Sequence, residues 1–115
     1  MTFKPRKIIN SSFKDHRGFY WTSWKKGVIK NITFKHDKFS LSKKNVLRGL
    51  HGDIKTWKLI SCPYGKFYLV VVNCEKKSKD YLKWKSWILS HENGVQVHVW
   101  YCYHFETVRV LQSLP

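Results

Sequence analysis

The sequence predicts an all-β domain, a sandwich or a barrel, and three observations support this class. Short stretches rich in aromatic and β-branched residues recur along the chain, separated by Gly, Pro, Asn and Asp at a spacing of about 8–12 residues. No segment of about eleven or more residues keeps the 3.6-residue apolar period of a capped helix. The most apolar run, residues 67–72, fits a central strand that is buried on both faces. We therefore expect roughly eight short strands and no substantial helix.

The expected elements follow one another along the whole chain. Strands are predicted, from their composition and alternation, at residues 7–10, 19–22, 32–42 (with a bend), 46–51, 57–62, 66–74 and 81–90. Turns or polar loops are predicted between them at residues 15–18, 25–27, 52–53, 63–65, 75–80 and 91–94.

The composition predicts one globular domain that attracts anions. The chain has 115 residues, of which 43% are hydrophobic and 17% aromatic, and this is enough to bury a core. Lys and Arg number 22 against seven Asp and Glu, which gives a formal net charge of +15. Nucleic acid, phosphorylated metabolites and an acidic membrane surface are all candidate partners for such a charge, and the charge does not choose among them.

The cysteines and the N-terminus predict a reducing, cytoplasmic location. Cys62, Cys74 and Cys102 form no C-x-x-C pair, and their odd number argues against a disulfide framework. Residues 1–7 are basic, but no apolar run follows them, so we expect no signal peptide. The longest apolar runs are too short to span a bilayer, and we expect no membrane partner.

Residues 45–59 combine a base, two cations and a turn. Arg48 and His51 lie in a predicted strand, and Lys58 begins the next one. Side chains alternate along a strand, so Arg48 and His51 are expected on opposite faces unless Gly49 marks a bulge. This pattern indicates part of an anion-handling site. A surface hairpin with a half-buried histidine is the alternative interpretation.

An ordered set of motifs resembles a known family. The motifs are Asp15-x-Arg17-Gly18-x-Tyr20, then Asp37-x-x-Ser40-x-Ser42-Lys43-Lys44-x-Val46-Leu47-Arg48-Gly49-Leu50-His51, and then Lys58-Leu59, Gly65 and Val70-Val71-Val72-Asn73. With these motifs in this order, residues 7–93 resemble the dTDP-4-dehydrorhamnose 3,5-epimerase family. Within it, the stretches His36-Asp37-Lys38-Phe39 and Leu50-His51-Gly52-Asp53 are more similar to the branch that acts on GDP-linked 4-keto heptoses.

The resemblance implies a fold and a chemistry. The fold would be a cupin-type jelly roll, and the protein would be a homodimer. The activity would be epimerisation of a nucleoside-diphosphate 4-keto sugar in surface polysaccharide synthesis, with no metal and no cofactor. The reaction moves protons on carbons beside a ketone, which requires a base on one face of the sugar. It also requires cations or hydrogen-bond donors where enolate charge develops.

The resemblance also implies roles for individual residues. His51 matches the base, because an imidazole can take a carbon-bound proton near neutral pH. Lys58 matches a lysine near the ketone oxygen, and Arg48 an arginine that binds substrate and stabilises the same charge. Arg17 matches an arginine that grips the diphosphate, where a guanidinium can bond two oxygens. Two further residues, His36 and Lys38, are candidates for contacts with sugar or base, whereas Asp15 is expected to form a turn or an ion pair.

The resemblance stops after residue 93. We expect one domain over residues 1–115, family-like over 7–93 and divergent over 94–115. The tail lacks the family's Pro-Pro pair and the tyrosine that donates a proton on the opposite face, and Tyr101, Tyr103 and His104 match no family motif. A jelly roll that is incomplete at the C-terminus is therefore expected, with slowed or abolished epimerisation. A frameshift near residues 95–98 is one hypothesis for this tail, and a divergent short form is the other.

Three function classes follow. The first is a nucleotide-sugar epimerase or its remnant. The second is a non-catalytic cupin that binds a nucleotide sugar or a full-length partner. The third, which we expect least, is a basic domain that binds single-stranded nucleic acid through exposed aromatic side chains. The epimerase requires Arg48, His51 and Lys58 to converge inside the fold. A cupin metal site is disfavoured because no His-x-His with an acidic partner is present.

Overall fold

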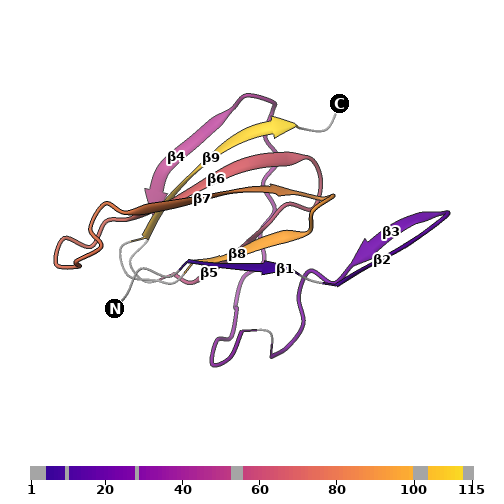
Figure 1. Cartoon of the computed structure of the whole chain (residues 1–115), viewed down its shortest axis with the longest axis horizontal. Helices are drawn as coiled ribbons and strands as arrows, with labels where there is room; N and C mark the ends of the chain where they lie inside the picture. The colour runs from indigo at the N-terminus through magenta and orange to yellow at the C-terminus, as the bar shows by residue number, and fades with distance from the viewer. Residues whose placement is uncertain (1–4, 10, 28, 53–55, 100–103, 113–115) are drawn as a thin grey trace.

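The computed structural model describes residues 5–9, 11–27, 29–52, 56–99 and 104–112, and these ranges contain nine strands and no helix (Figure 1). The described residues therefore include no helix that could cross a membrane. The strands are β1 (Arg6–Ile9), β2 (Ser12–Asp15), β3 (Gly18–Trp21), β4 (Leu47–Gly52), β5 (Lys58–Ser61), β6 (Lys66–Asn73), β7 (Trp84–Ser90), β8 (Val95–Val99) and β9 (His104–Gln112).

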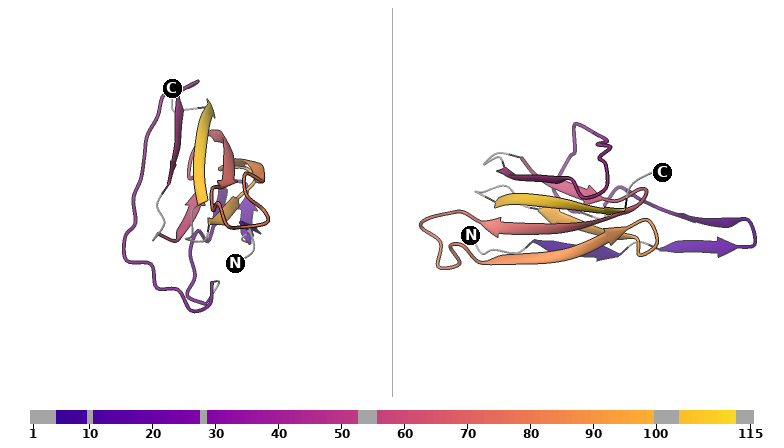
Figure 2. Two further views of the ribbon diagram at one scale, coloured as in Figure 1. Left: turned by 90° about the vertical axis from the view of Figure 1, so that its left-hand side faces the viewer. Right: turned by 90° about the horizontal axis from the view of Figure 1, so that it is seen from above.

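Seven of the strands form two sheets that pack face to face (Figure 2). One sheet has the strand order β1-β8-β5 and the other β4-β9-β6-β7, and every described pairing is antiparallel. Consecutive strands change sheet from β4 to β5, from β5 to β6, from β7 to β8 and from β8 to β9. The remaining two strands, β2 and β3, form a hairpin that projects from one end of the molecule (Figure 1).

The core lies between the two sheets and follows from alternation along the strands. On β6, Leu69 and Val71 are fully buried, whereas Val70 between them lies on the outer face. On β8, Val95, Val97 and Val99 face the other sheet in the same way. Burying these β-branched and leucine side chains supplies the main stabilisation of the sandwich. The remaining members of the core are Cys62 and Leu89, with Ile60, Phe67 and Trp87 packed against them.

Two of the crossings between the sheets, the β5–β6 and β7–β8 turns, contact each other at one end of the sandwich. The backbone N–H of Gly65, in the β5–β6 turn, donates to Nδ1 of His91, in the β7–β8 turn, at 2.9 Å. The Tyr64 ring stacks on the His91 ring with centroids 5.0 Å apart. Asn93 completes the second turn, since its side-chain oxygen accepts hydrogen bonds from the N–H groups of Ser90 and Val95. These contacts hold the two turns together at this end of the sandwich.

Residues 22–46 form an irregular segment along one side of the sandwich (Figure 2, left). The prediction of a strand at 32–42 was wrong, because none of the described residues there pairs with a sheet. The segment is instead held by single contacts. The side-chain amide of Gln96, on β8, donates to the carbonyl of Ser23 at 2.6 Å and to Oγ of Ser61 at 2.8 Å. Ile29 is buried, whereas Phe39 and Leu41 remain exposed.

The tail adds two strands that the sequence did not predict. Residues 94–115 supply β8 and β9. β8 lies between β1 and β5, and β9 lies between β4 and β6, so each is an interior strand of its sheet. Phe67 and Trp87 are half-buried, whereas Trp84 is exposed.

The other strand predictions are confirmed within one to three residues. The structure has strands at the six other predicted places, and the turns at 63–65 and 91–94 are also present. Besides β8 and β9, the sequence missed β2 (Ser12–Asp15), which has only one apolar residue in four. It forms through its pairing with β3, in which Phe13 lies opposite Tyr20.

The position of β9 leads to a first prediction. Val108 pairs with Arg48 on one side and Leu69 on the other, so Val108→Pro removes a backbone donor from an interior strand. We expect a loss of about 3 kcal/mol or more in the free energy of unfolding, measured by urea denaturation. Lys14→Pro, on the projecting hairpin, is the control. An equal loss in both variants would contradict the interior position of β9.

Candidate active site

A bulge in β4 brings two of the predicted site residues onto one face. Arg48 pairs with Val108 and His51 with Glu106, so three steps on β4 match two on β9, with an irregularity between Arg48 and His51. Gly49 lies within it and has φ of 106°, a conformation that glycine adopts readily. Simple alternation would have put the two side chains on opposite faces. The bulge therefore decides that Arg48 and His51 lie on the same face.

The strand register shows that this face is the interior one. The β9 residue that pairs with Arg48 also pairs with Leu69, and the one that pairs with His51 also pairs with Val71. Residues directly opposite each other in a sheet point to the same side. Leu69 and Val71 belong to the core, so Arg48 and His51 face the space between the sheets. Both residues remain exposed because β4 is the outermost strand of its sheet.

Lys58 approaches the same space from the other sheet. It pairs with Val99 on β8, and Ile60 pairs with Val97, so Lys58 shares the interior face of β5. Val99 ends β8, and β8 begins at the β7–β8 turn. His51 and Lys58 therefore both lie toward the end of the sandwich that is remote from this turn. Lys58 is half-buried there.

Ser42 orients the arginine. Nε of Arg48 donates to Oγ of Ser42 at 2.7 Å, across six residues of sequence. This contact joins the irregular segment to β4 and restricts the rotamers of a long side chain. Sequence reasoning placed Ser42 in the family motif but gave it no role, since only the tertiary contact shows its partner.

The arrangement suits proton transfer beside a carbonyl group. A histidine and an arginine from one sheet and a half-buried lysine from the other face the space between the sheets. Cations positioned where negative charge develops stabilise an enolate. Among the described residues, no three His, Cys, Asp or Glu side chains gather as metal ligands would.

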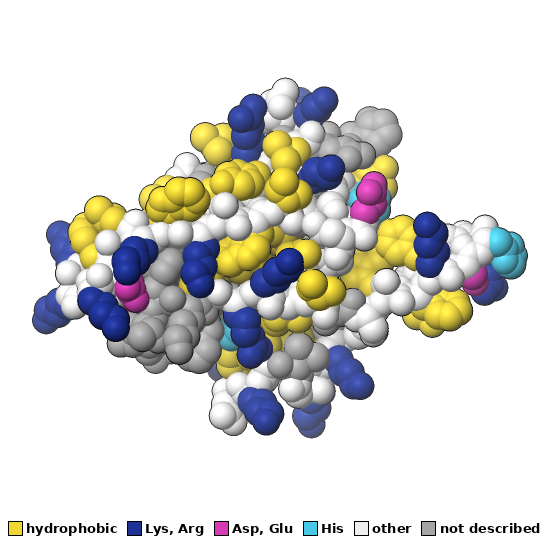
Figure 3. All heavy atoms as spheres, in the orientation of Figure 1, with side chains coloured by type: hydrophobic (Ala, Val, Ile, Leu, Met, Phe, Trp, Pro, Cys, Tyr) yellow, Lys and Arg dark blue, Asp and Glu magenta, His cyan; other side chains and the backbone are white. Residues whose placement is uncertain are grey.

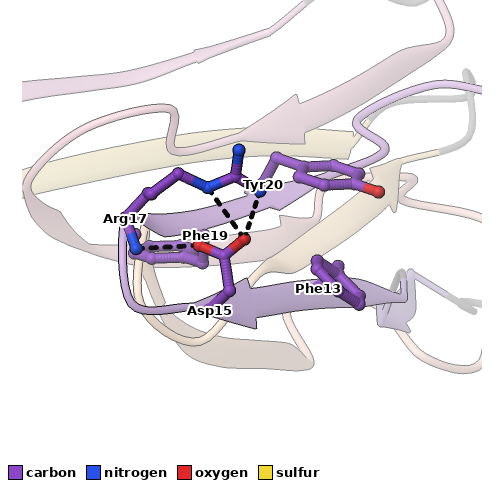
Figure 4. A pocket seen from close by; sticks show the side chains of 6 residues that line it. Phe13, Asp15, Arg17, Phe19 and Tyr20 are labelled. Atoms are coloured by element: carbon purple, nitrogen blue, oxygen red, sulfur yellow. Dashed lines mark hydrogen bonds and ion pairs between the residues drawn. The ribbon is translucent and has the colours of Figure 1, made fainter.

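Arg17 lies elsewhere, in the turn at the tip of the β2–β3 hairpin (Figure 4). Its Nη2 and Nε donate to Oδ2 of Asp15 at 2.6 and 3.1 Å, and its backbone N–H donates to Oδ1 at 2.8 Å. These hydrogen bonds hold the pKa of the Asp15 carboxyl below its ordinary value. The expected ion-pair role of Asp15 is thereby confirmed.

The hairpin projects from one end of the molecule, whereas β4 lies within the sandwich (Figure 1). The structure therefore does not bring Arg17 to His51 within one chain. A hollow of about 210 Å³ accompanies Arg17 on the hairpin, lined by Phe13, Asp15, Gly18, Phe19 and Tyr20. His36 and Lys38 lie on the irregular segment, where both are exposed and neither belongs to a sheet. Of the six predicted site residues, the structure thus joins Arg48, His51 and Lys58.

Comparison with known proteins identifies the family. The family model described as dTDP-4-dehydrorhamnose 3,5-epimerase matches residues 6–102. The chain belongs to this epimerase family. The match reaches nine residues beyond position 93, into the segment where the resemblance was expected to end. Similarity to the GDP-heptose branch stays a prediction.

Curated relatives of the epimerase family extend well beyond this chain. The dTDP-4-dehydrorhamnose 3,5-epimerase of Salmonella typhimurium is 37% identical over 95 residues, which cover 76% of this chain and 52% of the relative. The Escherichia coli enzyme is 35% identical over 95 residues, covering 76% and 51%. The chain thus spans about half the length of the curated relatives it matches.

Solved structures of epimerases confirm the cupin-like jelly-roll fold. An enzyme from Legionella pneumophila, solved in complex with dTDP-4-keto-L-rhamnose, superposes with a TM-score of 0.82 at 30% identity, over 93% of this chain and 60% of that one. The enzyme from Elizabethkingia anophelis gives a TM-score of 0.77 at 26% identity, over 96% and 69%. The all-β prediction and the implied jelly roll are both confirmed.

Sequence reasoning missed one buried histidine. His98 is 1% exposed and its ring stacks on Trp57 with centroids 5.5 Å apart. It lies on β8 between Val97 and Val99, so it faces away from the core and from the candidate site. Burial, with a smaller contribution from the charge of Arg6, lowers its pKa from 6.5 to about 4. The alternation in Val-Gln-Val-His-Val could have revealed this face.

The lowered pKa of His98 leads to a second prediction. The unfolded chain binds this proton more readily than the folded protein, so stability is complete above pH 6.5 and falls as pH drops towards about 4. The loss should be roughly 2–3 kcal/mol, measured as the free energy of unfolding at a series of pH values. His98→Gln should flatten the curve in this interval. An unchanged slope in the variant would assign the effect to other groups.

Proposed function

We propose that this protein exchanges protons on carbons beside the ketone of a nucleoside-diphosphate 4-keto sugar. The observation that carries the proposal is the convergence of Arg48, His51 and Lys58 on the interior faces of two sheets. This is the arrangement that the epimerase interpretation requires and that nucleic-acid binding does not. Membership of the epimerase family supports it independently.

The proposed reaction divides the work among these residues. The imidazole of His51 removes the proton from the carbon next to the ketone. Lys58 and Arg48 stabilise the negative charge that the ketone oxygen gains as the enolate forms. Arg17, His36 and Lys38 bind the rest of the substrate, the diphosphate being the partner of Arg17. No cofactor is required, since the ketone itself delocalises the charge.

We further propose that the protein acts as a homodimer in the cytoplasm and serves surface polysaccharide synthesis. The hairpin supports the dimer. It projects from the sandwich, pairs with no strand of the two sheets, and exposes Phe13, Phe19 and Tyr20. Within one chain, Arg17 lies on the projecting hairpin, outside the sheet that holds His51. In a dimer, the hairpin of one protomer would carry Arg17 to the site of the other.

The test of the activity is hydrogen exchange in heavy water. The protein is mixed with a dTDP-linked or a GDP-linked 4-keto sugar, and deuterium at the carbons flanking the ketone is followed by NMR. His51→Ala should slow the exchange by about 10²- to 10⁴-fold, because it removes the base. Lys58→Met should slow it by about 10²- to 10³-fold, because it removes a charge from the enolate oxygen.

Lys26→Met is the matched control for Lys58→Met, since Lys26 is an exposed lysine outside both sheets. It should exchange like the parent protein. A folded parent protein that binds the nucleotide sugar without exchange would refute catalysis and leave the non-catalytic cupin. Exchange that survives in His51→Ala would assign the base to another residue.

The shared site leads to a separate prediction. His51→Ala and Arg17→Ala variants should each be nearly inactive alone. After mixing and subunit exchange, half of the dimers are mixed, and each mixed dimer holds one site with His51 from one protomer and Arg17 from the other. Activity should then recover to about a quarter of the parent value.

The two arrangements of Arg17 give different results in this mixture. If Arg17 served its own chain, both sites of a mixed dimer would lack one residue, and mixing would restore nothing. The mixed population is verified by mass before activity is measured. Failure to recover activity in a verified mixture would contradict the shared site and leave the exchange result with His51→Ala unaffected.

A further inference from the structure

The loop between β6 and β7 presents apolar side chains among lysines. We define the lysine loop as residues 75–85. It contains five lysines (Lys76, Lys77, Lys79, Lys83 and Lys85) against Glu75 and Asp80. Three large apolar side chains rise from the same stretch, with Tyr81 at 42%, Leu82 at 57% and Trp84 at 60% exposure. A soluble surface rarely concentrates large apolar groups in this way without a partner.

The lysine loop is fixed in shape by a buried asparagine. Asn73 is 1% exposed, and its side-chain amide donates to Oγ of Ser78 at 3.1 Å and to the carbonyl of Asp80 at 3.2 Å. Its side-chain oxygen accepts from the N–H of Glu75 at 3.0 Å. The Asn73 backbone also accepts a hydrogen bond from the N–H of Leu82 at 2.7 Å. The loop is thus preorganised, which reduces the entropy lost when it binds.

Leu82 is held in an unfavourable conformation. Its φ is 64°, in the left-handed region, where a leucine is disfavoured by about 1 kcal/mol or more relative to glycine. More than half of its side chain is nevertheless exposed, so core packing does not compensate the cost. A residue that is costly in backbone conformation and poorly buried is explained most simply by a function of its side chain outside the fold.

The position of the lysine loop lets it reach an external surface. It forms one extreme end of the molecule along its longest axis (Figure 1). Hydrophobic and basic side chains lie side by side at this end (Figure 3). Leu82, Lys83, Trp84 and Lys85 line a hollow of about 480 Å³ together with Asp80, whose carboxylate is already paired with Nζ of Lys83 at 2.9 Å.

We propose that the lysine loop docks on the surface of an anionic phospholipid bilayer. Lysine amines would meet lipid phosphates, while Leu82, Tyr81 and Trp84 would enter the interface between headgroups and acyl chains. Tryptophan and tyrosine favour this region because each has an apolar ring and a polar tip. Leu82 favours a bilayer over single-stranded nucleic acid as the partner, since its side chain has no aromatic face on which a base can stack.

This inference departs from the expectation of no membrane partner. That expectation rested on the absence of an apolar run long enough to span a bilayer, and docking on a surface needs no such run. It agrees with the net charge of +15, which admitted an acidic membrane surface as a partner. The proposal does not depend on the enzymatic function proposed above.

The experiment is co-sedimentation of the whole protein with vesicles. Vesicles of phosphatidylcholine alone are compared with vesicles of phosphatidylcholine and phosphatidylglycerol. Binding should occur only to the anionic vesicles. Leu82→Gly should weaken it about tenfold by removing the inserted side chain. Because glycine relaxes the backbone at φ of 64°, this variant should fold at least as stably as the parent, as urea denaturation can verify.

Two matched controls test whether vesicle binding depends on the lysine loop itself or on the overall charge and exposed apolar surface of the protein. Leu41→Gly removes a leucine that is 74% exposed outside the loop, and it should leave binding unchanged. Reversing Lys76, Lys77 and Lys79 to Glu should weaken binding at least about a hundredfold. The same reversal of Lys25, Lys26 and Lys30, which are also exposed, should cost less than about tenfold.

Three results would overturn the proposal. One is an equal effect of Leu82→Gly and Leu41→Gly on vesicle binding. Another is an equal effect of the two charge reversals, which would mean diffuse attraction by the whole molecule. The third comes from fluorescence anisotropy with single-stranded oligo(dT). If Leu82→Gly weakened oligonucleotide binding as much as vesicle binding, the surface would belong to a nucleic-acid partner.

Discussion

The pairing of β9 with β4 and β6 is the constraint on which the candidate site depends. Among the described strands, β4 joins its sheet only through β9, and the register of β9 is set by its pairing with β6. Through β9, Arg48 is in register with Leu69 and His51 is in register with Val71. Both side chains therefore face the space between the sheets. A segment at the end of the chain thereby positions residues that lie more than fifty positions earlier.

A single glycine then decides which residues can cooperate. Regular alternation would separate Arg48 from His51, and an arginine on the outer face could not stabilise charge in the interior. The bulge at Gly49 removes one step from the alternation and returns both residues to one face. Lys58 reaches the same space by ordinary alternation, because it stands opposite Val99 at the end of β8.

The molecule distributes its polar and apolar surface unevenly. The projecting hairpin carries Arg17 and exposed rings at one end, and the lysine loop carries Leu82 and Trp84 at the other. Both are built on short antiparallel connections that extend beyond the sandwich and add little to its core. Each is stabilised locally instead, the hairpin by the Asp15–Arg17 ion pair and the loop by the buried amide of Asn73. Such extensions can evolve contacts without disturbing the packed sheets.

The sequence by itself determined the fold class, most strands and the family. Alternation, turn residues and the apolar run of β6 are local signals, and ordered motifs such as Arg48-Gly49-Leu50-His51 need no coordinates to be read. Only the tertiary structure decided the rest. Residues 32–42 have strand composition but pair with no strand of either sheet. The tail, in contrast, forms β8 and β9, each of which lies between two other strands. The sequence also could not determine on which face of β4 His51 lies or where Arg17 lies relative to it. Pairing partners, bulges and hairpin direction depend on contacts between residues far apart in the chain.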